Sequence, residues 1–435
     1  MINRLLGWLN ESTCNFLAAA TVVKELKGKG FKELYLNEEW KILPNEKYFV
    51  VKNGSAVFAF VTGDSADCFR NGARLIAAHT DSPCFRLKPN PEIYGDGGVV
   101  SLNVEKYGGG ILYTWFDRPL SMSGRVTVRT QNVMNPRDIV FDLKKPVATI
   151  PHLAIHFNRQ VNEGNHLSVQ KDMKPVVGYF NKEQIEQAKR GKGSVMEMIA
   201  DHCGVKADDI IGYEISLYPF EKAILTGENK EYLQSGRIDD LSMAFAGLEA
   251  LLNTCNTPSS YIRILALFDN EETGSGTRQG AASPVLRDIL ERVSKALGSG
   301  SQDFNIGVEN SFMISADDAH AWHPNYNEKY DPTNHPVIGG GPVIKINSNC
   351  KYMTDSRGAA IFKELCRKAG VNCQIFVNHA DVAGGSTLGN ILTSQLDFAG
   401  VDVGAAIWAM HSAMETAGVS DHLDFIKVFT TFWNQ

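Results

Sequence analysis

Three short apolar runs end abruptly in polar residues, and this pattern limits the folds open to the chain. The runs cover residues 74–78, 261–268 and 312–315, and they lead into His79, Asp269 and Asp317. Apolar runs of this length are typical of strands buried on both faces, as in parallel sheets. Because ligand sites in such sheets lie beyond the carboxyl ends of the strands, we expect His79 and Asp317 at one edge of an α/β domain.

Helical patterns surround these runs. They cover residues 240–252, 282–296 and 357–369. The apolar N-terminal residues predict one amphipathic helix that runs toward Lys27.

Residues 94–232 have a different character. They contain glycine clusters and alternating segments such as 124–129, with helical patterns at 181–190 and 193–203. Alternation between glycine-rich turns is typical of hairpins and antiparallel strands. We therefore expect a β-rich domain over 94–232, inserted into an α/β domain made of residues 1–93 and 233–435.

The composition excludes several kinds of protein. The 435 residues are too many for one ordinary core, so we expect two domains or one domain with an insertion. The formal net charge of −6 argues against nucleic acid as a main partner. No stretch approaches the ~18 consecutive apolar residues of a membrane span, and the apolar N-terminus is too short for a secretory signal.

The eight cysteines are scattered, and none form a Cys-x-x-Cys pair. In a chain of this length, such a distribution indicates reduced thiols in a cytoplasmic protein. A zinc finger is therefore not expected, and any zinc should be held by nitrogen and oxygen ligands.

Five separate segments contain residues that bind divalent metals. They are residues 77–81, 237–240, 270–272, 315–318 and 410–412. Together they offer two imidazoles and three carboxylates as ligands. Two zinc ions about 3.5–4 Å apart need such a mixture, because a carboxylate can bridge them while the other groups complete each site. The set predicts a hydrolase in which a metal-activated water attacks a carbonyl.

The spacing of His79 and Asp81 favours a metal ligand with an orienting partner. Alternate residues of an extended chain point the same way, so Asp81 can accept a hydrogen bond from the far ring nitrogen of His79. The alternative is a capped strand end with a surface histidine.

Glu271 and Glu272 follow a strand that we expect near the centre of the sheet. One can bind a metal while the other acts as a general base. The alternative is a solvated acidic loop.

The other three segments leave more choices open. Asp239 and Asp317 each lie beside a second aspartate, and chemistry alone allows either member of each pair to be the ligand. Asp240 could instead cap a helix. His411 follows the apolar run 405–410, where a core histidine is the alternative. His320 and His323 lie near Asp317 in the sequence and could support its site. Six further histidines have no spacing that indicates a site and are interpreted as surface or structural residues: His152, His166, His202, His335, His379 and His422.

Nearly the whole chain resembles the M18 family of metallopeptidases, the aspartyl aminopeptidases and their relatives. The matching motifs include Ala-His-Thr-Asp-Ser-Pro (78–83), Thr-Trp-Phe-Asp-Arg (114–118), Ile-Pro-His-Leu-Ala-Ile-His (150–156), Arg-Ile-Asp-Asp-Leu (237–241), Asp-Asn-Glu-Glu (269–272), Ser-Ala-Asp-Asp-Ala-His-Ala (315–321), His-Pro-Asn-Tyr (323–326), Gly-Pro-Val-Ile-Lys (341–345) and Met-His-Ser (410–412). The resemblance implies a zinc-peptidase α/β/α sandwich with an inserted β-rich dimerisation domain. It also implies a homo-oligomer, a tetrahedral dodecamer built from dimers.

The resemblance further implies a role for each residue. Asp239 would bridge two zinc ions per subunit, His79 and Asp317 would complete one site, and Glu272 and His411 the other. Cobalt or manganese could substitute at such ligands. Glu271 would be the general base and Asp81 the residue that orients His79. The positions expected to contact substrate are His156, from a neighbouring subunit, and His320, Lys345 and Tyr352.

The implied reaction is removal of the N-terminal residue from peptides with a free N-terminus. Lys345 could pair with an acidic side chain of the substrate, which predicts a preference for N-terminal Asp or Glu. The alternative interpretation of Lys345 is a solvated lysine at a strand edge. Two departures lie near the expected substrate pocket: residues 381–389 lack a Pro and a Cys that eukaryotic members carry, and Met414 stands where some members have Arg. The competing functions are an M18 aminopeptidase that prefers neutral or basic N-termini, a deacylase using the same metals, and a non-enzymatic scaffold.

Overall fold

The computed structural model describes residues 1–190 and 193–435, and their contacts divide the chain into two compact units. The first unit contains residues 1–81, 223–410 and 415–435. The second contains residues 82–222 and 411–414. The boundaries predicted from sequence, 94 and 232, fall at the end of β5 (Cys84–Tyr94) and at the start of β12 (Tyr232–Ser235).

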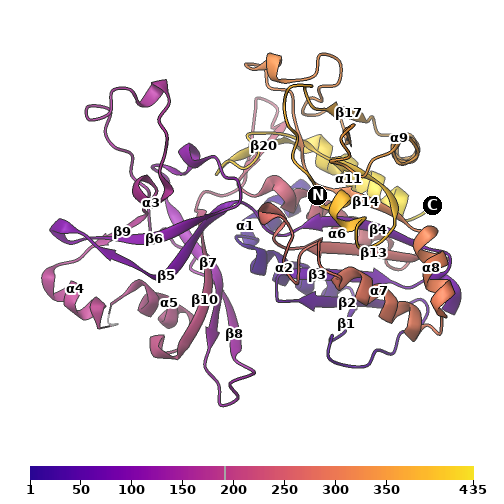
Figure 1. Cartoon of the computed structure of the whole chain (residues 1–435), viewed down its shortest axis with the longest axis horizontal. Helices are drawn as coiled ribbons and strands as arrows, with labels where there is room; N and C mark the ends of the chain where they lie inside the picture. The colour runs from indigo at the N-terminus through magenta and orange to yellow at the C-terminus, as the bar shows by residue number, and fades with distance from the viewer. Residues whose placement is uncertain (191–192) are drawn as a thin grey trace. The chain divides into compact units, whose positions relative to one another are not determined.

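A nine-stranded sheet forms the centre of the first unit (Figure 1). In sheet order its strands are β1 (Lys32–Glu33), β2 (Lys47–Lys52), β3 (Ala56–Val61), β13 (Ile262–Phe268), β4 (Ala73–His79), β14 (Phe312–Ala316), β18 (Ala399–Gly404), β16 (Val343–Ile346) and β17 (Gln374–Val377). β13, β4, β14 and β18 are parallel neighbours, so the carboxyl ends of the three predicted strands meet at one edge. The expected parallel strands are confirmed, within a mixed sheet in which β2 with β3, β3 with β13, and β16 with β18 are antiparallel pairs.

Side chains alternate between two cores, one on each face of this sheet. Along β4, Ile76 and Ala78 belong to one apolar cluster, and Leu75 and Ala77 to the other. The first cluster includes residues of α1 (Ile2–Glu11), α2 (Asn15–Gly28), α6 (Ile238–Thr254), α9 (Ser356–Ala369) and α11 (Val419–Phe432). The second includes residues of α7 (Val285–Ala296), α8 (Ser301–Glu309) and α10 (Leu388–Leu392). The unit is therefore the expected α/β/α sandwich.

The N-terminal segment differs from the single helix expected from sequence. It forms α1 and α2, which are separated at Ser12, Thr13 and Cys14. Ser12 and Thr13 are both buried, and Arg237 donates to the carbonyl oxygens of Leu9 and Ser12 at 3.1 Å each, where α1 ends.

A smaller five-stranded sheet completes the first unit. Its order is β11 (Ile224–Thr226), β12, β20 (Glu415–Gly418), β19 (Ala406–Trp408) and β15 (Ala319–His320).

The second unit is built on a six-stranded antiparallel sheet (Figure 1). The order is β8 (Arg137–Asp142), β7 (Leu120–Val128), β10 (Ile210–Pro219), β5, β6 (Val99–Tyr107) and β9 (Val176–Tyr179). It also contains α3 (Val169–Asp172), α4 (Lys182–Lys189) and α5 (Val195–Cys203). The prediction of an inserted β-rich region is confirmed, because the alternating segment 124–129 lies in β7.

A helix needs about 20 apolar residues to cross a bilayer. No helix within residues 1–190 and 193–435 provides such a span.

Candidate metal centre

His79 is the last residue of β4, and aspartate residues contact both its backbone N–H and its imidazole ring. The side chain is 1% exposed. Its N–H donates to Asp240 Oδ2 at 3.0 Å, and Nδ1 lies 3.0 Å from the carbonyl oxygen of Asp81. The Asp81 carboxylate is farther from Nδ1, at 3.4 Å. The backbone of Asp81 is therefore the nearer acceptor for Nδ1–H, and Nε2 faces Asp239 Oδ1 at 3.5 Å.

Three predicted ligands come together inside the first unit. His79, Asp239 and Asp317 offer one ligand atom each, and these atoms lie within 4.8 Å of one another. All three residues are buried. Burial lowers the pKa of His79, but the carboxylates around it, Asp240 first, raise that pKa well above its ordinary value. Burial raises the pKa of Asp317 to about 6, although Lys345 opposes the shift.

Asp240 and Asp318, the second aspartates of the two Asp-Asp pairs, lie close to this group. Asp240 and Asp318 are buried, and their carboxylates lie within 4.8 Å of the Asp239 carboxylate. Asp318 accepts from the Ser242 hydroxyl at 2.9 Å, while Asp240 accepts from the backbone of His79. The backbone of α6 is non-helical at Asp239 and Asp240, so its regular turns begin after Asp240, as the alternative from sequence required. The Asp240 carboxylate, however, accepts from the backbone of His79. Burial raises the pKa of both carboxyl groups well above the ordinary value.

Glu271 and Glu272 begin the turn that follows β13. Their backbone N–H groups donate to the two carboxylate oxygens of Asp81 at 3.1 and 3.2 Å. Both side chains offer oxygens within 4.8 Å of a His79 ring nitrogen. Burial raises the pKa of Glu271 to about 8, with His79 opposing and the neighbouring aspartates adding to the shift. The structure therefore differs from the alternative of a solvated acidic loop.

Two predicted site residues belong to the second unit. His411 follows Met410, which ends a segment of the first unit. Its Nδ1 lies 3.3 Å from the carbonyl oxygen of Gly109, and its own carbonyl oxygen accepts from Ile111 N–H at 3.0 Å. His156 is exposed. The roles of both residues stay predictions.

The expected substrate contacts differ in their surroundings. Lys345 is 4% exposed in β16, with its Nζ 3.8 Å from Asp317 Oδ2, so it is not a solvated lysine at a strand edge. Its Nζ lies 5.8 Å from the ring centre of Tyr352, which is also buried. Burial lowers the pKa of Lys345, but Asp317 and other acids raise it by more. His320 is exposed, and its ring centre lies 5.8 Å from that of Phe376.

Sequence reasoning missed two buried acids that support this group. Glu415 Oε2 accepts from the backbone N–H groups of Ile238 and Asp239, at 2.7 and 3.2 Å. Asp402 accepts from Thr387 and Met353, and it is fully buried. A single carboxylate inside an apolar strand is costly without partners, and that signal was present at Asp402 in β18. Glu415 is the first residue of β20 and carried no such signal.

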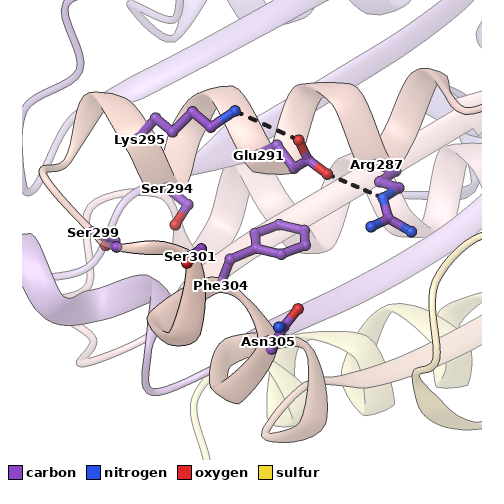
Figure 2. A pocket seen from close by; sticks show the side chains of 9 residues that line it. Arg287, Glu291, Ser294, Lys295, Ser299, Ser301, Phe304 and Asn305 are labelled. Carbon is purple, nitrogen blue, oxygen red and sulfur yellow. Dashed lines mark hydrogen bonds and ion pairs between the residues drawn. The ribbon is translucent and has the colours of Figure 1, made fainter.

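A separate pocket of about 300 Å³ lies between α7 and α8 (Figure 2). Glu291 reaches Arg287 at 3.1 Å and Lys295 at 3.7 Å, as Figure 2 shows. None of the predicted site residues lines it. Arg287 and Lys295 both contact Glu291, and we assign this pocket no part in the candidate metal centre.

The chain matches the family described as aminopeptidase I zinc metalloproteases (M18) over residues 8–433. The chain belongs to the M18 family. It is 43% identical over 432 residues to the probable M18 family aminopeptidase 2 of Clostridium novyi, which covers 99% of this chain and 98% of that protein. This membership makes the chain a zinc metalloaminopeptidase, a hydrolase.

Solved M18 structures share the fold. Ape4, in a cryo-EM structure of its complex with Nbr1, is 33% identical with a TM-score of 0.94, over 98% of this chain and 84% of that one. The S. cerevisiae mApe1 dodecamer is 26% identical with a TM-score of 0.85, over 100% of this chain and 96% of that one.

Proposed function

We propose that this M18 peptidase removes the N-terminal residue of peptides at a site that holds two zinc ions. The observation that carries the proposal is the buried group of His79, Asp239 and Asp317 beside Glu271. One imidazole and several carboxylates, packed within 4.8 Å and shielded from water, need a cation to balance their charge. This donor set of nitrogen and oxygen fits zinc, and cobalt or manganese would fit the same ligands.

Asp239 would bridge the two ions. His79 and Asp317 would complete one site, and Glu272 and His411 the other. Glu415 supports this assignment, because its carboxylate accepts from the Asp239 N–H and holds the bridging residue in place. Asp81 supports the assignment of Glu272 in the same way.

Bound zinc would polarise the scissile carbonyl and lower the pKa of a water from 15.7 towards about 7. Glu271 takes a proton from the attacking water and returns it to the nitrogen of the leaving amine. Its position suits both steps, since one carboxylate oxygen lies within 4.8 Å of ligand atoms of His79 and Glu272.

Lys345 supports a preference for N-terminal Asp or Glu, together with His320 and Tyr352. A buried cation that pairs with an acidic substrate side chain discriminates against an apolar one, which would leave the cation without that partner. The alternative is an aminopeptidase that prefers neutral or basic N-termini. One observation favours it: Lys345 already lies 3.8 Å from Asp317 and is almost fully buried.

We further propose that the first compact unit is the catalytic domain and the second a dimerisation domain. The S. cerevisiae mApe1 dodecamer supports a homo-oligomer. The form that the family resemblance implies is a tetrahedral dodecamer built from dimers, in which His156 would reach the active site of a neighbouring subunit. Residue 156 is exposed within its own unit, as such a contact requires. The cytoplasm is the proposed compartment, since scattered cysteines without a Cys-x-x-Cys pair are typical of reduced cytoplasmic proteins.

The test compares initial rates for peptides that begin with Asp, Asn, Leu or Lys and are otherwise identical. The zinc-loaded protein should cleave all of them from the N-terminus, and the Asp peptide should exceed its uncharged match, Asn, if Lys345 reads the charge. Faster cleavage of Leu or Lys would replace the acidic preference with the alternative. Cleavage of N-acylated substrates alone would overturn the aminopeptidase proposal in favour of a deacylase.

A further inference from the structure

Two cysteine thiols contact one another at the end of α9. Cys366 lies in the last turn of the helix, and Cys373 directly precedes the edge strand β17. Their side chains are hydrogen-bonded. The Cys366 side chain is 1% exposed, whereas the Cys373 side chain is only partly buried.

The backbone fixes both thiols. α9 ends at Gly370, whose φ of 68° is left-handed, and Val371 N–H donates to the carbonyl oxygen of Cys366 at 2.9 Å. After Cys373, Gln374 N–H donates to the carbonyl oxygen of Pro342 at 2.8 Å, and Gln374 pairs with Val343 of β16. Backbone hydrogen bonds before and after the 366–373 segment therefore fix its two ends and keep the two thiols in contact.

The pair is chemically unequal. The hydrogen bond from Cys366 lowers the pKa of the Cys373 thiol to about 7, against the effect of burial, and Lys363 lowers it further. The same hydrogen bond and burial raise the pKa of Cys366. Cys373 is thus the nucleophile at neutral pH, and Cys366 is a protonated thiol within reach of it.

We propose that Cys366 and Cys373 form a redox-active dithiol that a hydroperoxide converts to an intramolecular disulfide. The Cys373 thiolate attacks one oxygen of hydrogen peroxide and breaks the O–O bond. With one proton, the departing hydroxide becomes water, and Cys373 becomes a sulfenic acid. The Cys366 sulfur then attacks the Cys373 sulfur, and the S–O bond breaks. The Cys366 proton leaves with that oxygen as a second water, so two thiols and one peroxide yield one disulfide and two waters.

This site is separate from the proposed peptidase chemistry. Neither cysteine belongs to the groups that could hold a metal. β17 pairs with β16, which carries Lys345, but the disulfide would join only the end of α9 to the start of β17. We therefore expect oxidation to leave the zinc content unchanged.

The test treats the zinc-loaded full chain with equimolar hydrogen peroxide at pH 7, blocks the remaining thiols with iodoacetamide, and maps tryptic peptides without reduction. Arg367 and Lys368 lie between the two cysteines, so trypsin separates them and the disulfide shows as a linked pair of peptides. The expected result is that this link accounts for most of the oxidised protein. Cys373→Ser should abolish it, and Cys366→Ala should leave a Cys373 sulfenic acid that dimedone traps.

Cys350→Ser is the matched control, because Cys350 is the exposed cysteine and lies outside the pair. It should leave the yield of the link unchanged. The proposal is overturned if Cys366 and Cys373 are both recovered as separate alkylated peptides after peroxide treatment. It is equally overturned if Cys350 forms the main disulfide.

Discussion

At the scale of single residues, burial gives ordinary side chains unusual proton affinities. Glu271, Asp317 and His422 have the same chemistry as their exposed counterparts, yet the pKa of each is displaced because the charged form loses its hydration. In the metal centre this effect is spread over several coupled groups, whereas at His422 it acts alone.

Glu271 is the residue on which the proposed chemistry depends most directly. Glu271→Gln keeps the shape of the side chain and removes the proton acceptor, so kcat should fall by about 10²–10⁴ while two zinc ions still bind. Steady-state rates and metal analysis of the same samples check this. Glu309→Gln, at an exposed acid of α8, should change neither. Near-normal turnover in Glu271→Gln would remove Glu271 from the role of base.

His422 should make the protein sensitive to mild acid. It is 1% exposed on α11, and neither ring nitrogen has a hydrogen-bond partner in the described part of the chain. Burial lowers its pKa from 6.5 to about 4. Below pH 6.5 the imidazole is therefore protonated in the unfolded chain but stays neutral in the native state. The free energy of unfolding falls as the pH drops from 6.5 towards 4, by on the order of 3 kcal/mol.

Urea unfolding at pH 7.5 and pH 5.0 measures this effect. His422→Leu should narrow the difference in unfolding free energy between the two pH values, because the ionisable group is gone. His202→Leu, at an exposed histidine of α5, should keep the wild-type difference. Equal pH dependence in wild type and His422→Leu would show that His422 does not cause it.

At the scale of elements, the fold depends on close approaches between helices and strands that only small residues allow. A β-carbon on Gly358 of α9 would lie 2.1 Å from the carbonyl oxygen of Gly400 in β18. Arg263 of β13 makes a junction of a different kind, because its long side chain donates to the carbonyl oxygens of Trp433, Thr254 and Thr257. These contacts join the ends of α6 and α11 to the sheet.

Gly358→Ala should therefore destabilise the protein by about 1–3 kcal/mol, since the helix must move away from the strand. Gly7→Ala is the matched control: it lies in α1, and its β-carbon would meet nothing within 4 Å. That change should stabilise by up to about 1 kcal/mol through helix propensity. Thermal denaturation of both variants compares them, and equal effects would contradict the close-packing explanation.

At the scale of the whole molecule, segments far apart in the sequence bring several carboxyl groups together in the interior of the first unit. Asp239, Asp240, Asp317 and Asp318 are all buried near one another, and Lys345 and His79 oppose their charge. Such an arrangement is unfavourable without a cation, so part of the native stability should come from the metal.

Removal of zinc should accordingly lower the melting temperature, and zinc added at a hundredfold excess over its Kd should restore about 2.7 kcal/mol per site. Calorimetry of the chelated and reloaded protein measures this. Magnesium, which prefers oxygen ligands in octahedral geometry, should restore less. An unchanged melting temperature after complete removal of zinc would argue that these residues do not hold the metal.

Sequence patterns alone were enough to predict the parallel strands, the β-rich insertion and the residue types of the candidate metal centre. Each of these depends on local patterns: an apolar run, alternation between glycines, or a histidine and carboxylates at a strand end. The helices expected at 240–252, 282–296 and 357–369 are α6, α7 and α9, with ends that differ by a few residues. The break between α1 and α2 was missed because tertiary packing decided it.

The contacts that distinguish one acid from its neighbour follow from the folded chain and not from the local sequence. Asp239 and Asp240 are adjacent and chemically identical, and no local signal separates them. The fold does, because the N–H of His79 from β4 reaches Asp240 while Glu415 from β20 supports Asp239. The contact between Cys366 and Cys373 was invisible for the same reason: it forms where the end of a helix returns to the edge of a sheet. Sequence patterns report the environment of one segment, whereas these features arise from distances between several.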